Sequence, residues 1–337
     1  MFAVPPPEIL IQGILSGILM GFVYALIAAG LSLIFGLMEI VNFAHGEFLM
    51  LSMYTAFWMY ALFALDPLLS VPICAAVLFG LGWLSYVGII RRILGGPMLA
   101  QIFATFGLAI FLRSAAQFLW TPDFRQVSKA WIQGPVRILG ISVGLPQVVA
   151  SAACLVAFGI LYWFITRTET GAALEATAQD RQAAALMGIN TERMFALGWG
   201  IGSACVGVAG AFLASFFYVF PHVGALFALI AYVTVALGGF GSVPGSLVAG
   251  VLIGVIEVLG GLLIAPAFKY VAVFVVYLVV VLLRPHAAVP EGLPLGIPVP
   301  HQQVPVLLHR AGAPHAVPAG ELADRADTAG ILSPRDP

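Results

Sequence analysis

The sequence predicts an all-α integral membrane protein, a polytopic bundle of eight to nine transmembrane helices with broken helices in both halves. Hydrophobic residues make up 61% of the chain, charged residues only 9%, and the mean hydropathy is +1.06. An ordinary soluble domain carries about 25% charged residues. Apolar runs also recur at the length that crosses a bilayer, and polar or glycine-rich interruptions separate several of them.

The expected spans are apolar runs bounded by charge, proline or glycine. A helix needs about 20 such residues to cross the hydrocarbon core. The runs are Ile9–Leu31, Phe48–Leu65, Leu68–Ile90, Met98–Trp120, Pro146–Ile165, Met194–Val219, Ala225–Leu237, Ser246–Ile264 and Phe268–Leu283. The seventh and ninth are short enough to tilt, re-enter or merge with a neighbour, which leaves the count at eight or nine.

Arginine near the ends of the spans predicts the orientation. Arg91 and Arg92 mark one loop, and Arg167, Arg181 and Arg193 mark another loop two spans later. Both loops should therefore lie on one side of the membrane, and the excess of positive charge there indicates the cytoplasm.

The stretch "VNFAHGEFLM" places polar groups between the first two spans. Asn42, His45 and Glu47 stand there with Gly46 among them. Ionisable groups at membrane depth cost about 3 kcal/mol or more, so they usually face a cavity or mark a pathway. The alternative is an ordinary connecting loop at the interface, with its polar residues in water.

The second half of the chain contains a similar interruption. In "FYVFPHVGALFAL", Pro221, His222 and Gly224 precede an apolar run. Paired interruptions in two halves of a transporter point to a central binding site. We therefore expect Asn42, His45, Gly46, Glu47 and His222 to line a translocation pathway or gate.

A third interruption, "ALGGFGSVPGSLVAG", is rich in glycine. We interpret it as a break between half-helices, and we add Gly238, Gly239, Gly241 and Ser242 to the predicted pathway. A phosphate-binding loop is the alternative, but the pattern G-x-x-x-x-G-K-[ST] occurs nowhere in the sequence.

Small residues at fourfold spacing predict close packing between helices. They are Gly13, Gly17 and Gly21; Ser203, Gly207, Ala211 and Ser215; and Ser246, Gly250 and Gly254. Such spacing lets helix backbones approach closely in lipid, with no need for contact with a solute.

The polar loop 167–193 lies on the arginine-rich side. Its alanines favour a short surface helix, with Gly188 as a stop and Asn190 as an N-cap for the next span. Composition alone leaves open whether this helix is a connector or a docking element.

The chain is expected to divide into a transmembrane domain, residues 1–284, and a disordered tail rich in proline and alanine, residues 285–337. The scattered histidines of the tail and three separated cysteines do not form a metal site. Nucleic-acid binding is excluded because the chain has only two lysines and no basic surface.

Three motifs make the chain resemble a known family. They are "GLSLIFGLMEIVNFAHGEFLMLSMY", "TETGAALEATAQDRQAAALMGINTERM" and "ALGGFGSVPGSLVAGVLIGVIE". From Gly13 through Pro285 the chain is similar to the permease subunit of bacterial branched-chain amino acid ABC transporters, the LivH type.

This resemblance implies a multi-pass subunit of the bacterial inner membrane, surrounded by lipid. Its implied partners are a second homologous permease, two ATP-binding cassette ATPases and a periplasmic solute-binding protein. ATP would be bound by the ATPases, which leaves this chain without a cofactor and without enzymatic activity. The resemblance also implies a coupling helix that meets the ATPase, carrying Glu175, Ala176, Asp180, Ala184, Leu186 and Gly188.

The leading hypothesis is thus a permease subunit of an ATP-driven importer for branched-chain or similar hydrophobic amino acids. The alternative is an autonomous channel or secondary carrier for a small polar solute such as an amide or urea, driven through Glu39, Glu47 or Glu257. A membrane enzyme is disfavoured because no further catalytic arrangement of residues stands out.

Overall fold

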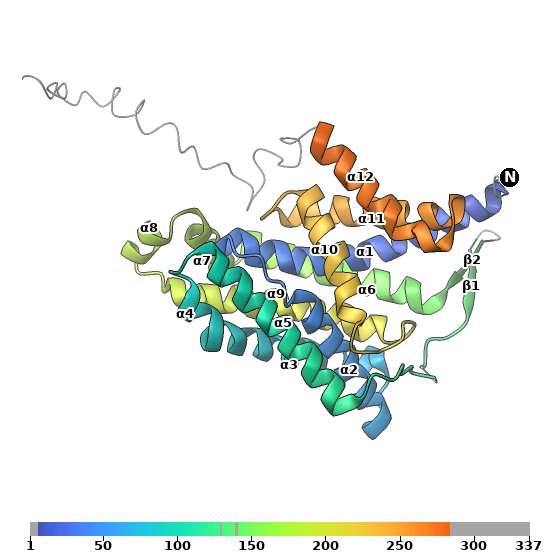
Figure 1. Ribbon diagram of the computed structural model, residues 1–337, viewed down its shortest axis with the longest axis horizontal. Helices are drawn as coiled ribbons and strands as arrows, with labels where there is room; N and C mark the ends of the chain where they lie inside the picture. The colour runs from blue at the N-terminus through green and yellow to red at the C-terminus, as the bar shows by residue number, and fades with distance from the viewer. Residues whose placement is uncertain (1–5, 129, 139–140, 284–337) are drawn as a thin grey trace, which may run out of the picture. The chain divides into compact units, whose positions relative to one another are not determined.

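The computed structural model describes residues 6–128, 130–138 and 141–283. Most of these residues form helices (Figure 1). The predicted tail, residues 285–337, lies outside the described residues.

The first half of the described chain contains α1 (Pro7–Met38), α2 (His45–Phe63), α3 (Pro67–Ser85), a π-helical turn η1 (Tyr86–Ile90), α4 (Arg91–Ile93) and α5 (Met98–Trp120). A short antiparallel hairpin follows, β1 (Pro135–Ile138) with β2 (Ile141–Gly144). The remaining elements are α6 (Leu145–Arg167), α7 (Glu169–Gln179), α8 (Arg181–Leu186), α9 (Thr191–Leu213), α10 (Val223–Gly238), α11 (Val243–Leu263), η2 (Pro266–Phe268) and α12 (Lys269–Leu283).

The described helices fit an all-α membrane protein, but the predicted count of eight to nine spans is not confirmed. Six helical segments are long and apolar enough to cross a membrane, namely Pro7–Met38, Pro67–Ile93, Met98–Trp120, Leu145–Arg167, Thr191–Leu213 and Val243–Leu263. Val223–Gly238 and Pro266–Val280 are apolar but shorter, and α2, with its polar first turn, is outside both groups.

Several predicted boundaries move. Helix α1 continues to Met38 instead of ending at Leu31, and α9 ends at Leu213 before the predicted Val219. The interruption after α1 is therefore short, and His45 and Gly46 form the first turn of α2 instead of preceding it. The β-hairpin was not predicted, because its four-residue strands carry little periodic signal.

Glycine brings α1 and α11 into contact along their backbones. A Cβ on Gly21 would lie 2.5 Å from Val251 Cα, and one on Gly17 would lie 2.7 Å from Val255 Cα. On the opposing helix, a Cβ on Gly250 would lie 2.7 Å from Ala25 Cα. The predicted role of the fourfold small-residue spacing in these two helices is thus confirmed.

The same kind of contact joins α9 to α3. A Cβ on Gly207 would lie 2.9 Å from the Cys74 carbonyl oxygen, and a Cβ on Gly82 of α3 would lie 2.6 Å from the Trp199 carbonyl oxygen. In α9 the small residues again mark the contact side of the helix. Ser215, the last of the predicted series, lies beyond the end of α9.

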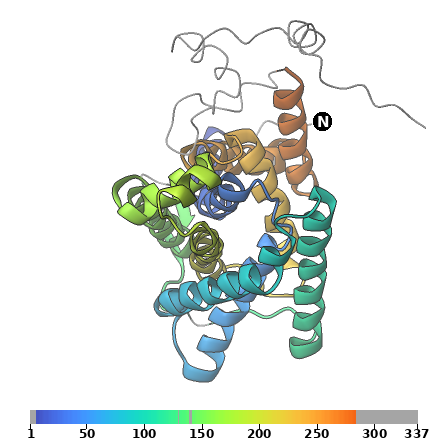
Figure 2. The ribbon, with the colours of Figure 1, turned by 90° about the vertical axis from the view of Figure 1, so that its left-hand side faces the viewer.

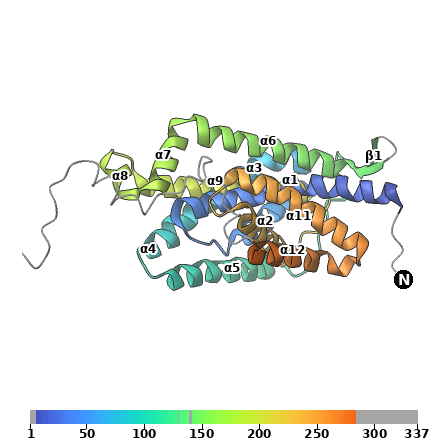
Figure 3. The ribbon, with the colours of Figure 1, turned by 90° about the horizontal axis from the view of Figure 1, so that it is seen from above.

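The two halves of the chain pack in an equivalent way. Helix α1 packs most extensively against α11, and α9 packs most extensively against α3. Likewise α10 packs on α1, and α2 packs on α9. The two long helices α1 and α9 contact each other where Gly30 meets Gly202. Viewed along the helices, α1 and α9 lie inside the bundle (Figure 2), and α6 runs on the side opposite α5 and α12 (Figure 3).

The arginine-bearing loops lie together at one end of the bundle. Arg91 Nε lies 3.0 Å from Glu192 Oε2, and Arg181 Nη2 lies 2.6 Å from Glu192 Oε1. These ion pairs confirm the prediction that both loops lie on one side. We call this the arginine-rich end.

Gly21→Ala should lower stability, because the added methyl group would meet the backbone of α11. The cost of overpacking is about 1–3 kcal/mol. Thermal unfolding of the purified protein in detergent measures it. Gly107→Ala in α5 is the matched control, since a Cβ there meets nothing within 4 Å. Equal midpoints for the two variants would contradict the close contact.

Candidate functional site

Two helix N-termini meet inside the bundle. Helix α2 begins at His45 and α10 begins at Val223. Gly46 and Gly224 lie against each other, because a Cβ on Gly46 would overlap the Gly224 carbonyl and a Cβ on Gly224 would overlap the Gly46 carbonyl. The two interruptions predicted from the sequence are therefore brought together at one point.

The carboxylate of Glu47 lies between the two helix ends. Glu47 belongs to the first turn of α2, and its Oε2 is 3.0 Å from the position that a Cβ on Gly224 would take. A helix N-terminus carries a partial positive charge of about half a unit. The buried carboxylate therefore lies where the partial charges of both N-termini favour an anion, and its Oε2 has no hydrogen-bond partner among the described residues.

Arg113 of α5 pairs with the same carboxylate. Its Nε lies 3.1 Å from Glu47 Oε1, and its Nη2 contacts the same oxygen. Glu47 is almost fully buried, whereas the Arg113 side chain remains 31% exposed. The ion pair thus has a buried anion and an accessible cation.

Asn42 and His45 bind the backbone of neighbouring segments. His45 Nε2 lies 2.9 Å from the Ile27 carbonyl oxygen of α1, to which it donates. The Asn42 side-chain oxygen accepts from the Ala44 N–H at 3.1 Å, and the Tyr232 hydroxyl of α10 donates to the Asn42 carbonyl oxygen at 2.8 Å. Neither Asn42 nor His45 has exposed surface, which argues against an ordinary loop in water.

His222 completes the cluster on its exposed side. It directly precedes α10 without a side-chain capping bond, and its Nε2 lies 2.8 Å from Gln117 Nε2 of α5, which donates. We call the set Asn42, His45, Gly46, Glu47, Arg113, Gln117, His222, Gly224 and Tyr232 the polar junction. It joins α2, α5 and α10 through charged and hydrogen-bonded groups.

The polar junction lies within the depth of the long helices. Arg113 stands four residues, about 6 Å, beyond the midpoint of α5 at Ala109. The hydrocarbon core is about 30 Å thick, so this residue lies inside it when α5 spans the membrane. His45 reaches Ile27, which is likewise an internal residue of α1.

Residues 13–283 match the profile of a protein family described as "Branched-chain amino acid transport system / permease component". The chain belongs to this family. It is a membrane permease component and not an enzyme.

Curated relatives agree over most of the chain. The high-affinity branched-chain amino acid transport system permease protein LivH of Salmonella typhimurium is 30% identical over 290 residues, covering 82% of this chain and 94% of the relative. The corresponding permease protein BraD of Pseudomonas aeruginosa is 31% identical over 295 residues, covering 83% and 96%. No solved structure gives a significant match.

Three residues of this permease's polar junction are not among the pathway residues predicted from the sequence. Arg113, Gln117 and Tyr232 lie inside predicted spans, where they were read as part of the apolar pattern. An arginine in the middle of a span was itself a usable signal, since intramembrane ionisable residues are rare and usually functional.

The third predicted interruption is not part of the polar junction. Gly239 (φ 92°) and Gly241 (φ 84°) form a tight turn between α10 and α11, next to Gly36. Gly238 ends α10, and Ser242 caps α11 by accepting the Gly245 N–H at 3.1 Å. This turn is separated from the polar junction by α10, whose 16 residues span about 24 Å.

The predicted surface helix of loop 167–193 is two helices. Asp180 ends α7 and caps α8, because its carboxylate accepts the N–H groups of Gln182 and Ala183 at 2.8 and 2.9 Å. Gly188 (φ 84°) follows α8, and the Asn190 side chain caps α9 at 3.0 Å from Arg193 N. The predicted stop and N-cap are both confirmed.

The predicted coupling residues face different ways. Ala184 is buried, Glu175 and Ala176 are half-buried, and Asp180 and Gly188 are exposed. Leu186 is 89% exposed, and the neighbouring Met187, which was not predicted, is 82% exposed. Two large apolar side chains therefore project from the arginine-rich end.

The carboxylates of the carrier alternative are placed apart. Glu257 accepts from the Tyr24 hydroxyl at 2.5 Å and pairs with Lys269 at 2.9 Å. Glu39 ends α1 in a left-handed conformation, with φ 56°. Within the described ranges, no group of three or more His, Cys, Asp or Glu side chains could hold a metal ion.

Glu47→Gln should destabilise the permease by roughly 2–4 kcal/mol, because it leaves the Arg113 charge without its buried partner. Adding Arg113→Met should recover part of this loss, since the double variant has no unpaired charge. Unfolding midpoints of the two single variants and the double variant in detergent form the cycle. Strictly additive losses would show that the two side chains do not interact.

Proposed function

We propose that this permease is the membrane subunit of an ATP-driven importer and that amino acids cross at the polar junction. The observation that carries the proposal is the meeting of α2 and α10 at buried Gly46 and Gly224, with charged groups around them. Half-helices that meet inside a membrane are a recurrent way to build a solute site.

The chemistry of the polar junction suits an amino acid zwitterion. The partly exposed Arg113 offers a positive group to a carboxylate, and Glu47, buried against Arg113 in the structure, would offer a negative group to an ammonium once this pair opens. Large apolar side chains, Phe106 and Ile110 of α5 and Leu226 of α10, are exposed on the adjacent helices. These surfaces would suit a branched-chain or similar hydrophobic side chain, as the names of the relatives suggest.

The remaining parts of the importer would come from other chains. The sequence contains no phosphate-binding motif with its lysine, so ATP would be bound by two cassette ATPases. A second permease would complete the membrane part, and a periplasmic binding protein would deliver the solute across a bacterial inner membrane. Leu186 and Met187 are apolar anchors of the kind that insert into a partner's groove.

The autonomous channel or secondary carrier remains the second candidate, now with a specific observation attached to it. Glu257 is buried, accepts from the Tyr24 hydroxyl and pairs with the partly exposed Lys269, and ionisable groups inside a membrane protein often mark ion pathways. Transport by this chain alone, driven by a gradient, would favour it over the importer.

Reconstitution distinguishes the two candidates. Proteoliposomes that contain this permease, its partner permease and the ATPases, supplied with the binding protein, should take up leucine only with ATP. In them, His45→Ala and Glu47→Gln should each lower uptake tenfold or more, whereas Glu39→Gln, outside the polar junction, should leave it near normal. Uptake of leucine, an amide or urea by vesicles that hold this chain alone, without ATP, would overturn the proposal.

The double variant Leu186→Ser, Met187→Ser should weaken retention of the ATPase at least tenfold, because it removes the exposed apolar anchors. Co-purification from mild detergent, quantified against the wild-type complex, measures this loss. Gln182→Ser, an exposed neighbour on α8, is the matched control. Normal retention by the double variant would exclude these two side chains from docking.

A further inference from the structure

Three buried hydrogen-bond donors near the C-terminal ends of α2 and α5 have no partner. They are the Tyr54 hydroxyl, Trp58 Nε1 and Arg125 Nε, and none of them finds an acceptor among the described residues. Buried polar atoms without a partner are few in native proteins, so three donors at one place require an explanation. We call Tyr54, Trp58, Trp120 and Arg125 the donor cluster.

Contacts hold the donor cluster together in a closed ring. The Tyr54 ring stacks on Trp120 with centroids 4.3 Å apart, and Arg125 Nη2 donates to the Trp120 carbonyl oxygen at 2.6 Å. The Arg125 guanidinium lies 5.2 Å from the centre of the Trp58 ring. Tyr54 and Trp58 are four residues apart on α2 and are therefore neighbours on one face of that helix. The three donors thus belong to a single site.

Arg125 brings a positive charge to this site. None of the ion pairs between described residues includes Arg125. The carboxylate of Asp123 instead accepts from the Thr121 hydroxyl at 2.6 Å, and that of Asp66 accepts from the Trp131 N–H at 2.6 Å. Hydrogen bonds from a guanidinium to a carboxylate are strong because charge assists them. An unpaired Nε beside two neutral donors therefore favours an anionic oxygen ligand.

The donor cluster lies at the end of the bundle opposite the arginine-rich end. Helix α5 begins after Arg91 and Arg92, and its 23 residues extend about 34 Å to Trp120. In the proposed function, this is the side from which the solute arrives. The first charged groups that the solute meets would then include Arg125.

Two turns of helix separate the donor cluster from the polar junction. On α2, Tyr54 stands seven residues and Trp58 eleven residues after Glu47, spacings that place all three on one face. On α5, Trp120 stands seven residues after Arg113, which corresponds to about 10.5 Å. The polar junction has unpaired buried atoms of its own, namely Asn42 Nδ2, His45 Nδ1 and Glu47 Oε2. The same signature thus marks two successive places along α2.

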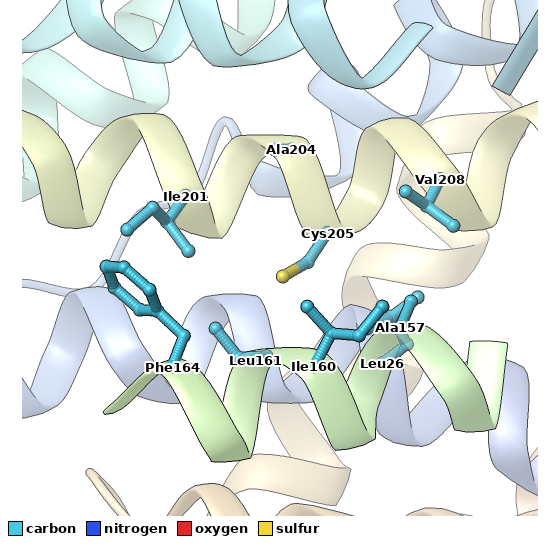
Figure 4. A pocket seen from close by; sticks show the side chains of 9 residues that line it. All are labelled: Leu26, Ala157, Ile160, Leu161, Phe164, Ile201, Ala204, Cys205 and Val208. Atoms are coloured by element: carbon cyan, nitrogen blue, oxygen red, sulfur yellow. The ribbon is translucent and has the colours of Figure 1, made fainter. Parts of the chain in front are cut away.

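The groove between α1, α6 and α9 offers an anionic group nothing of this kind. The side chains around it include Leu26, Ile160, Leu161, Phe164, Cys205 and Val208 together with alanines (Figure 4). None of these side chains carries a strong hydrogen-bond donor. The groove suits acyl chains and not the charged end of a solute.

We propose that the donor cluster is an outer binding site for the carboxylate of the transported amino acid, occupied before the solute reaches the polar junction. The proposal rests on the proposed function, in which amino acids cross at that junction. The carboxylate would accept from Arg125 Nε and from the neutral donors beside it, and would then pass to Arg113. Amides and urea, the solutes of the carrier alternative, lack this anionic group.

Photolabelling of the complete membrane complex tests the proposal. Both permeases and the ATPases, in phosphatidylcholine nanodiscs without binding protein, are irradiated with a leucine analogue that carries a diazirine in its side chain. Mass spectrometry should find adducts in peptides of this chain that contain Tyr54–Trp58 or Trp120–Arg125. Excess 4-methylpentanoate, which keeps the carboxylate, should lower this labelling at least tenfold. Excess leucinamide, which lacks the carboxylate, should leave it nearly unchanged.

Two variants connect the labelling to the donors. Arg125→Gln should lower labelling of these peptides at least tenfold, because it removes the charged donor. Tyr54→Phe keeps the stacked ring and should lower it about threefold, the loss expected for one neutral hydrogen bond. It also guards against a folding defect in Arg125→Gln, whose native side chain holds the Trp120 carbonyl. Tyr60→Phe, on a different face of α2, is the matched control and should have no effect.

The outer site is overturned if leucinamide competes as well as 4-methylpentanoate, or if both variants leave the labelling intact. It is also overturned if phosphatidylglycerol in the nanodiscs removes the labelling, because the occupant would then be a lipid headgroup. Adducts in peptides that contain Asn42–Glu47 and ATP-driven leucine uptake are measured in parallel. Normal uptake with adducts at the polar junction alone would reject the outer site and leave the proposed function standing.

Discussion

The contact between Gly46 and Gly224, with the Glu47 carboxylate beside it, is the constraint on which the rest of the structure depends. Two helix N-termini of like partial charge repel each other in a nonpolar environment, and a nearby anion offsets that repulsion. That anion must itself be balanced, and Arg113 of α5 supplies the opposite charge. This arrangement of charges links α2, α5 and α10 to one another.

The helices around this contact provide the rigidity that such an arrangement needs. Buried charge pairs contribute little net stability, so the polar junction cannot hold the bundle together by itself. The glycine contacts of α1 with α11 and of α9 with α3 bring backbone against backbone over long stretches. In lipid this close packing is a main source of helix association.

Much of this fold could be predicted from the sequence, since long apolar runs and fourfold glycine spacing are strong local signals. The interruptions at His45 and His222 were also visible, but their contact was not, because nothing in either segment specifies its partner. Arg113 was missed because span prediction averages over a window in which one arginine is outweighed by its apolar neighbours. The break at Asp180 was missed because alanine-rich segments favour a continuous helix, and the capping of α8 depends on one side chain.

The glycine seams also limit how this protein can move. Where backbones touch without intervening side chains, sliding or separation would open a void that no side chain can fill. The pairs α1 with α11 and α3 with α9 therefore behave as two rigid units. Any change in helix arrangement must occur where these units contact each other. The two pairs contact each other where Gly30 of α1 meets Gly202 of α9, and the helices packed on them, α2 and α10, meet at Gly46 and Gly224. These two glycine contacts define an axis about which the helix pairs can tilt relative to each other while the backbone contacts inside each pair stay intact.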